Sequence, residues 1–173
     1  LIDNSDLTVD DLMLYIKGPD FPTGAQIYDP EVIKQAYATG RGSVVMRAVA
    51  EIQEDSRGQQ RIVISEIPYQ VNKATLISKI AELVKEKTIV GVSDVRDESD
   101  RKNMVRIVIE LKKEAFASKI LNQLYKMTQM QGNFSFNMIA LVDGIQPRIL
   151  SLKSILEEFI KHSKSKYKSI TAV

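Results

Sequence analysis

The sequence predicts an α+β fold: a largely antiparallel sheet with helices packed on one face. One observation is that several runs alternate apolar and polar residues with a period of two, in pairs joined by polar turns. A second is that the stretches between these pairs repeat their apolar residues at helical spacing. Paired strands follow each other directly, with helices before, between and after the pairs, and this order is typical of the α+β class.

The first part of the chain predicts two helices separated by a rigid, non-helical segment. The first helix begins at Thr8, whose side chain can cap it while Asp11 reaches back from three residues later. Residues 17–28 follow a non-helical path, because prolines and glycines interrupt them. Asp29-Pro30 starts the second helix, as a cap followed by a proline in the first turn. The TGRG stretch, residues 39–42, ends it.

A β-hairpin is predicted next, followed by a helix. Residues 43–53 form its first strand, 54–60 its turn and 61–69 its second strand. The apolar face of the first strand consists of Val44, Met46, Ala48, Ala50 and Ile52. The pattern becomes helical from Asn72 onward, with one apolar side made of Leu76, Ile77, Ile80, Ala81, Leu83 and Val84.

The second half predicts another strand pair, a helix, further strands and a last helix. The strand pair occupies residues 89–113 around a charged loop, and its return arm alternates Val105, Ile107, Ile109 and Leu111 with Arg106 and Glu110. The helix at 114–127 aligns Phe116, Ile120, Leu124 and Met127. Residues 133–144 and 146–151 are predicted strands. The last helix opens at Ser151 with a stripe of Leu152, Ile155, Leu156, Phe159 and Ile160.

Two segments follow from this order: an α+β domain over residues 1–150 and a helical segment over 151–173. The chain opens on LID without a cap, and the last helix loses its apolar stripe after Ile160. We therefore expect the sequence to be a piece of a longer protein.

Composition excludes several classes of site. The 173 residues contain no cysteine, so disulfides, thiolate nucleophiles and Cys-based zinc or iron–sulfur sites are excluded. The single histidine, His162, is interpreted as a solvated residue near a helix end. With 24 Lys and Arg against 22 Asp and Glu, the charge does not by itself indicate nucleic acid. The absence of a long apolar run and of a signal layout favours a cytoplasmic protein without a membrane segment.

Two polar clusters are better explained by structure than by chemistry. Asp94, Asp97, Glu98 and Asp100 could hold a hard cation, but Arg96 and Arg101 interleave with them, so we expect a self-paired loop and no metal site. The TGRG stretch is too short for a phosphate-binding loop, although Arg41 is expected to lie exposed on its turn.

The stretch EIPYQVNKATLISKI, residues 66–80, is the strongest candidate for a binding site. If Asn72 caps the helix, Lys73 lies in its first turn, where the helix dipole disfavours a cation unless an anion binds there. Tyr69 and Gln70 carry side chains of the kind that donate hydrogen bonds to phosphate oxygens. The residues alone leave two interpretations open, a phosphate-binding corner and an ordinary helix cap.

Several blocks, in order along the chain, resemble the A subunit of bacterial DNA gyrase and its topoisomerase IV counterpart, the type IIA topoisomerases. They are GPDFPTGAQI, TGRGSVVMRA, EIPYQVNKATLISKIAELVKEK, RDESDRKNMVRIVIELKK and LNQLYKMTQMQGNFSFNMIALVDG. The resemblance covers roughly residues 3–162 and implies a tower domain over 1–150. Residues 151–173 would then be the start of the helix that continues into the coiled-coil arm.

The resemblance implies a parent enzyme that cuts one DNA duplex, passes another through it and reseals it with ATP. The family's nucleophile is a tyrosine that follows an arginine in an upstream winged-helix domain. None of the tyrosines here follows an arginine, so no catalytic residue is expected among Tyr15, Tyr28, Tyr37, Tyr69, Tyr125 and Tyr167. Mg²⁺ and ATP would be bound by the partner B subunit, and a second copy of the A subunit would complete the heterotetramer on the bacterial nucleoid.

For this segment the resemblance implies binding to the arms of a bent duplex and a link from the cleavage core to the dimer-closing arm. It makes Gln70, Asn72 and Lys73 candidate DNA contacts, together with Arg41 and Arg47. DRKNMVRIV and DGIQPR are each one residue longer than the family's pattern, which predicts a bulge or a longer turn. After His162 the family's Arg-rich continuation is replaced by SKSKYKSITAV, so contacts of the arm with DNA are unassigned.

The competing hypothesis is a protein-interaction module without DNA affinity of its own. In either case we expect the isolated chain to be monomeric, because the family's dimer-closing contacts belong to the arm beyond this segment. The residues do not distinguish gyrase from topoisomerase IV.

Overall fold

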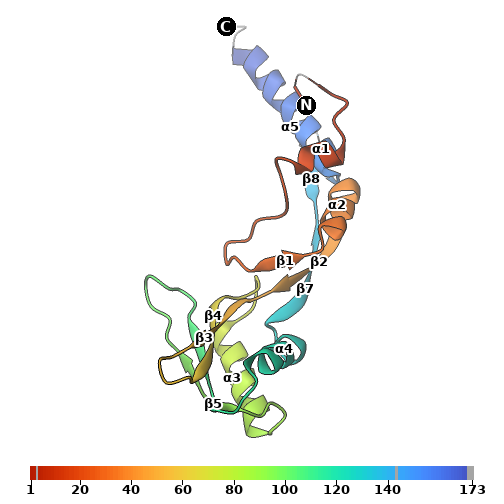
Figure 1. The fold of residues 1–173 in the computed structure, drawn as a ribbon. Helices are drawn as coiled ribbons and strands as arrows, with labels where there is room; N and C mark the ends of the chain where they lie inside the picture. Colours follow the sequence, from red (N-terminus) through yellow and green to blue (C-terminus); the bar gives the residue numbers. More distant parts are fainter. Residues whose placement is uncertain (3, 143, 171–173) are drawn as a thin grey trace. The chain divides into compact units, whose positions relative to one another are not determined.

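The computed structural model describes residues 1–2, 4–142 and 144–170, with side chains described as far as residue 166. The chain divides into two compact units. The terminal unit comprises Leu1–Pro19, Asp29–Val44 and Phe134–Val173, and the central unit comprises Asp20–Tyr28 and Val45–Asn133. Helices and antiparallel strand pairs make up both units (Figure 1), so the predicted α+β class is confirmed.

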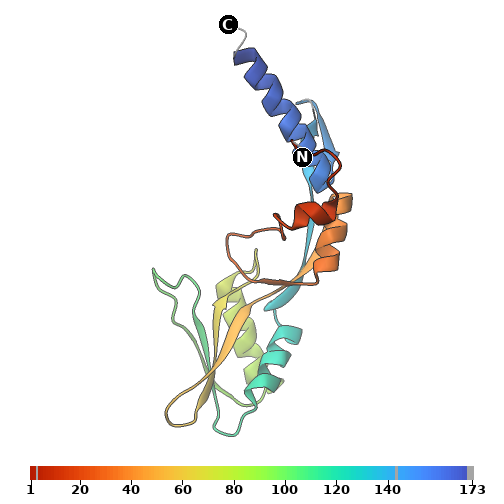
Figure 2. The same ribbon diagram turned by 45° about the horizontal axis from the view of Figure 1, so that its top comes forward.

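A four-stranded sheet forms the centre of the central unit, in the order β3-β4-β6-β5, with each neighbouring pair antiparallel. Two helices, α3 and α4, lie along it (Figure 2). The bounds of these elements are β3 Val49–Glu54, β4 Gln60–Glu66, α3 Lys73–Lys85, β5 Val92–Asp97, β6 Ile107–Leu111 and α4 Ala117–Met127.

The core of the central unit lies between this sheet and its two helices. Isoleucines at alternate positions of β4 and β6 point to one face and contact the apolar sides of α3 and α4 in a single cluster. Fully buried members of that cluster include Ile62, Ile64, Ile107, Ile109, Leu76, Ile80 and Leu124. The prediction that helices cover one face of an antiparallel sheet is therefore confirmed for this unit.

A second sheet has the order β1-β2-β7, with β1 at Gln26–Tyr28, β2 at Arg41–Arg47 and β7 at Gln131–Asn137. The segment 17–28, predicted to be non-helical, contains the short strand β1. Its antiparallel pairing with β2 sets Gln26 opposite Arg47 and Tyr28 opposite Val45. This pairing joins segments about twenty residues apart, and a three-residue strand is too short to show a period.

The terminal unit packs α1 (Val9–Met13), α2 (Pro30–Thr39) and α5 (Leu152–Ile170) against each other, beside the hairpin β8 (Ile139–Val142) and β9 (Gln146–Ile149). Their buried residues are Leu12, Ile33, Ala36, Tyr37 and Leu152. Within the described residues no helix, α5 included, combines the length and apolar character needed to cross a membrane.

The predicted helix starts are confirmed. Thr8 and Asp11 form a reciprocal capping box on α1, and Asp29 accepts hydrogen bonds from the first turn of α2. TGRG ends α2 as predicted, with Gly40 in the left-handed conformation (φ 78°). The helix that opens after Ser151 continues beyond His162 to Ile170.

Two long predicted strands are each divided in two. The strand predicted at 43–53 breaks at Ala48, whose N–H donates to the Met130 carbonyl (2.7 Å) and whose carbonyl accepts from Tyr125 Oη (3.1 Å). The strand predicted at 133–144 breaks at Met138, whose N–H donates to the Gly40 carbonyl (2.8 Å). The break residues hydrogen-bond to other parts of the fold, which side-chain alternation cannot show.

Some residues assigned to apolar faces are exposed. Phe116 is 79% exposed, because α4 begins one residue later and its N-cap residue does not share the helix's buried face. Phe159 is 66% exposed on α5 and Ile52 39% exposed on the edge strand β3. Ala81 is also exposed, on the outer side of α3.

A matched pair of substitutions tests this assignment of the core. Ile52 and Ile62 are directly opposite each other on β3 and β4, but Ile62 is fully buried. We expect Ile62→Ala to lower the free energy of unfolding by about 2–5 kcal/mol, since it leaves a cavity. Ile52→Ala should cost about 1 kcal/mol or less. Urea denaturation measures both, and equal losses would contradict the assignment.

Candidate nucleic-acid interface

The N-terminus of α3 is a capped helix start, as the sequence predicts. Asn72 Oδ1 accepts a hydrogen bond from the Thr75 backbone N–H (3.0 Å) and a longer one from Thr75 Oγ1 (3.3 Å). This satisfies one of the backbone donors that a helix start leaves unpaired. Asn72 is exposed, so the cap lies at the surface of the central unit.

The turn that leads into this cap is supported from a distant segment. The Val71 N–H donates to the Pro68 carbonyl (3.1 Å), and Gln70 is exposed with φ 67°, a conformation uncommon outside glycine. The ring of Tyr69 contacts that of Phe21 at 5.5 Å between centroids. The segment before β1 thus packs against this turn, and we call residues 69–73 the α3 corner.

Lys73 lies in the first turn of α3 as predicted, but it is not uncompensated there. Its Nζ forms an ion pair with Asp97, at 2.9 Å from Oδ2 and 3.2 Å from Oδ1. Asp97 ends β5 opposite Ile107, a residue that points toward the helices. The sheet register therefore places a carboxylate beside the positive helix end, so the anion that compensates Lys73 comes from the chain itself.

Asp97 is itself strongly stabilised as a carboxylate. The Ser99 hydroxyl donates to it, then Lys73, then the Ser99 backbone N–H, and together they lower the pKa of Asp97 to about 2. The side chains of Lys73 and Asp97 are still 30% and 40% exposed. The pair is thus a surface ion pair, and such pairs contribute about 0–1 kcal/mol.

Asp94 and Glu98 of this loop are paired with basic side chains as predicted, whereas Asp100 accepts hydrogen bonds from the backbone N–H groups of Lys102 and Asn103. Arg96 lies within 3.3 Å of carboxylates of Asp94, Glu98 and Glu110, and Arg106 also reaches Glu98. These contacts raise the pKa of Arg96, chiefly through Glu110. Within the described part of the chain, no group of His, Asp and Glu side chains is placed to hold a metal ion.

Arg47 lies in a second cluster of the central unit. Its guanidinium carbon lies 4.6 Å from the ring centre of Tyr28 and 4.7 Å from that of Tyr125. Its Nε donates to Gln131 Oε1 at 2.7 Å. An arginine over aromatic rings is held by cation–π attraction and by stacking.

Arg41, the remaining candidate, belongs to the terminal unit and is exposed at the start of β2. The two glycines beside it have packing roles that the sequence did not indicate. A Cβ on Gly40 would lie 2.3 Å from the Leu150 carbonyl oxygen, and one on Gly42 would lie 2.3 Å from Cβ of Ala36. TGRG therefore also allows close backbone packing, beyond ending α2.

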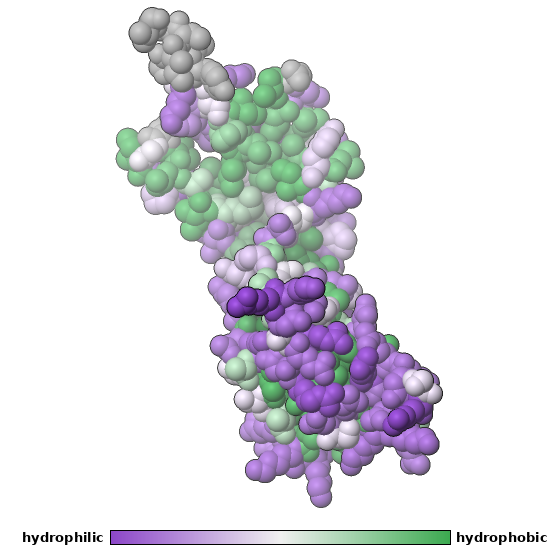
Figure 3. Space-filling model, turned by 90° about the vertical axis from the view of Figure 1, so that its left-hand side faces the viewer, coloured by the Kyte–Doolittle hydropathy of each residue, from purple (hydrophilic) through white to green (hydrophobic). Residues whose placement is uncertain are grey.

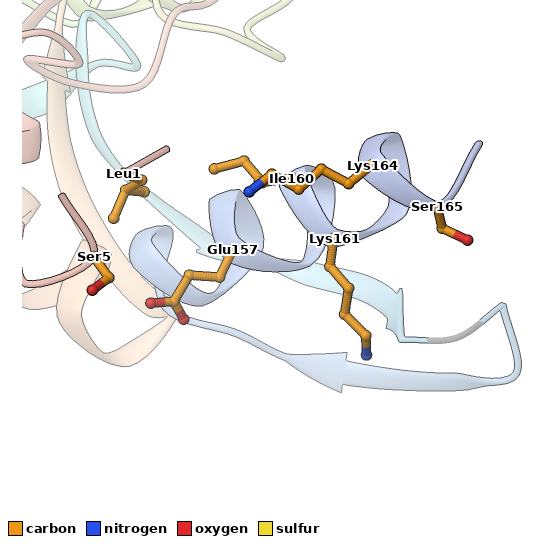
Figure 4. A pocket seen from close by; sticks show the side chains of 7 residues that line it. All are labelled: Leu1, Ser5, Glu157, Ile160, Lys161, Lys164 and Ser165. Carbon is orange, nitrogen blue, oxygen red and sulfur yellow. The ribbon is translucent and has the colours of Figure 1, made fainter. Parts of the chain in front are cut away.

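The terminal unit contains a hollow of about 940 Å³ along α5, lined by Leu1, Ser5, Glu157, Ile160, Lys161, Lys164 and Ser165. Glu157 and Lys161 point to the same side of α5 (Figure 4). These residues supply no nucleophile with an adjacent base. On the face of the molecule in Figure 3, hydrophobic residues gather on the terminal unit, whereas the central unit is mostly hydrophilic.

Among the five candidates, the structure groups Gln70, Asn72 and Lys73 at the α3 corner and places Arg47 in the second cluster. Sequence reasoning missed the partners of two candidates. Lys73 pairs with Asp97, and Arg47 contacts Tyr28, Tyr125 and Gln131. The available signal was the period-two alternation of 43–53, which put Arg47 on the polar face. It could not identify contacts that come from β1, α4 and β7.

Comparison with known proteins gives a consistent result. A family model described as the A subunit of DNA gyrase/topoisomerase IV matches residues 1–172. The DNA gyrase A subunit of Clostridium acetobutylicum is 56% identical over 93% of this chain and 19% of its own length. The same subunit of Halalkalibacterium halodurans is 56% identical over 92% and 19%, and that of Pseudomonas aeruginosa 54% over 95% and 18%. The chain thus spans about a fifth of these curated relatives.

The ion pair at the α3 corner predicts a dependence of stability on pH. Because the pKa of Asp97 lies near 2, below its ordinary 3.8, the ionised carboxylate stabilises the fold above about pH 4, and this is lost as pH falls toward 2. We expect Asp97→Asn to lower the free energy of unfolding by about 1 kcal/mol or less at neutral pH. The difference from the unsubstituted chain should disappear near pH 2.

Urea denaturation across this pH range measures the effect, and NMR titration of the Asp97 carboxyl provides a control. Lys73→Met should raise the pKa of Asp97 only in part, because Ser99 still donates to it. A stability difference that persists unchanged to the lowest pH would contradict the assignment.

Proposed function

The chain belongs to the DNA gyrase/topoisomerase IV A-subunit family, and from this we propose that it is the segment of that subunit that binds and supports the arms of a bent duplex DNA. In this proposal the central unit contacts the sugar–phosphate backbone through the α3 corner, with Gln70, Asn72 and Lys73. Arg47 and Arg41 make further contacts. Helix α5 of the terminal unit continues, in this proposal, into the arm that closes the dimer.

The observation that carries the proposal is the partly exposed cation at the N-terminus of α3. Lys73 is held by a surface ion pair of small net stability, which a phosphate can replace while it gains the backbone N–H groups of the helix end. Asn72 and Gln70 are exposed on the same corner. Contacts of this kind position a duplex without reading its sequence, as a support for flanking DNA requires.

The cutting and resealing of DNA belong, in this proposal, to other parts of the complex. None of the tyrosines of the sequence follows an arginine, and the carboxylates near α3 are committed to basic partners. Mg²⁺ and ATP are then bound by the partner B subunit, and a second copy of the A subunit completes the assembly. Such a protein acts in the bacterial cytoplasm, on the nucleoid.

A second candidate function, protein interaction, is favoured by the surface of the terminal unit. Four large apolar residues of β8, its turn and α5 are 60–80% exposed: Ile139, Leu141, Ile145 and Phe159. Exposed apolar residues gathered in one region mark contacts with other protein surfaces. The two functions are compatible, because the apolar residues and the α3 corner belong to different units.

Sedimentation tests whether the apolar surface drives self-association. We expect the isolated chain to be monomeric, because our proposal assigns closure of the dimer to the arm beyond α5. The variant Leu141→Ser/Phe159→Ser should then sediment like the unsubstituted chain. A tight dimer of the unsubstituted chain at micromolar concentration would contradict the expectation. If the double variant were then monomeric, the interface would be identified.

A salt titration with a short fluorescent duplex tests the DNA-binding proposal. Phosphate contacts give a linear fall of log K with log salt, with a slope of about −0.9 for each contact. We expect Lys73→Ala to weaken binding for all sequences about equally and to make the slope shallower by roughly one unit. Asp97→Asn should strengthen binding, because it frees Lys73 from its partner.

The matched control is Asn72→Ala, which should lower the free energy of unfolding by about 1 kcal/mol through the lost cap, with or without DNA. Duplex binding that neither Lys73→Ala nor Asp97→Asn changes would leave the α3 corner as an ordinary cap. Absence of duplex binding would exclude the proposal and leave the protein-interaction function.

A further inference from the structure

The Arg47 cluster has a geometry of its own. Arg47 is the last residue of β2, and Gln26 is its direct partner across the β1–β2 pair. Tyr28 lies two residues further along β1, on the same face as Gln26. The second ring, Tyr125, comes from α4, and Gln131 from β7. Elements far apart in sequence therefore converge on one guanidinium.

Each aromatic ring in this cluster is held by its own hydroxyl. Tyr28 Oη donates to Gln26 Oε1 at 2.8 Å, and Tyr125 Oη donates to the Ala48 carbonyl at 3.1 Å. Burial raises the pKa of Tyr125, so this phenol stays a neutral donor. With two rings and the Gln131 oxygen fixed, the side chain of Arg47 has little freedom left to lose on binding.

The charge of Arg47 is left uncompensated by this arrangement. All its contacts, two rings and an amide oxygen, are neutral, and no carboxylate among the described residues pairs with it. Arg47 is half-buried, and because Arg61 Nε is the single buried side-chain nitrogen or oxygen without a partner in the described residues, neither Nη atom of Arg47 is both fully buried and unpaired. Lys73, in contrast, is neutralised by Asp97.

We propose that Arg47 is a preorganised binding site for one DNA phosphodiester group, in which Tyr28, Tyr125 and Gln131 are positioning residues. The two Nη atoms present a planar pair of donors, which matches two oxygens of a phosphate. Gln131 occupies Nε and thereby fixes the direction in which this pair points. The inference rests on the proposed DNA-binding function and makes Arg47, instead of Lys73, its principal contact.

Substitutions that remove the charge of Arg47, its planar guanidinium group or the ring of Tyr28 should affect duplex binding differently. Arg47→Ala should weaken duplex binding roughly ten-fold and make the salt slope shallower by about 0.9. Arg47→Lys should keep the slope but recover only part of the affinity, because an ammonium lacks the planar fork. Tyr28→Ala should weaken binding about two- to five-fold at an unchanged slope, and Tyr28→Phe should restore most of the loss.

A double-mutant cycle on this chain separates positioning from direct contact. In the Arg47→Ala background, Tyr28→Ala should have no further effect on duplex affinity, because the residue it positions is gone. Thermal unfolding of each variant shows whether it is folded, and Tyr28, 46% exposed, is the ring whose removal disturbs the core least. Tyr125→Phe tests the other ring without removing it.

The outcomes that would overturn the inference are distinct. If Arg47→Ala leaves the duplex affinity and the salt slope unchanged while Lys73→Ala weakens binding, the Arg47 site is excluded and the proposed function stands. A loss in Arg47→Ala that depends on DNA sequence would mean a base contact instead of a phosphate contact. An additive effect of Tyr28→Ala in the Arg47→Ala background would make Tyr28 a direct contact. No duplex binding by the unsubstituted chain would exclude both proposals.

Discussion

The register of the four-stranded sheet in the central unit is the constraint on which the α3 corner depends. A shift of one residue between β4 and β6 would turn the isoleucines of one of the two strands, Ile62 and Ile64 or Ile107 and Ile109, away from α3 and α4, so burial of both sets fixes the pairing. The same register sets Asp97 opposite Ile107 at the end of β5. Hydrophobic packing thus decides which carboxylate meets the first turn of α3.

Lys73 and Arg47 of the central unit differ in how their positive charges are balanced. Lys73 lies at the positive end of a helix, where a carboxylate partner removes an unfavourable interaction with the dipole. Arg47 lies over neutral rings, which attract the guanidinium without cancelling its charge. The first arrangement stabilises the fold and screens the cation, whereas the second keeps the full charge available to an anion. The distinction comes from the partners and not from the residue types.

Local signals were sufficient for much of the fold. The starts of α1, α2 and α3 were predicted at Thr8, Asp29 and Asn72, because capping depends on residues within a few positions of one another. Errors arose where a distant hydrogen bond decided the outcome. Ala48 interrupts an otherwise regular alternation because Met130 and Tyr125 bind its backbone, and nothing near residue 48 in the sequence indicates this.

The sequence by itself determined the fold class and the helix caps, because each follows from residue type and short-range spacing, whereas the set of cationic candidates came from the resemblance to the family. The sequence also carried this resemblance, which depends on the order of residues and not on their contacts. Only the tertiary structure decided which of those cations is neutralised. Asp97 reaches Lys73 across 24 positions, and Gln131 reaches Arg47 across 84. Strand register and helix packing set such distances, because they bring together residues that no local pattern relates.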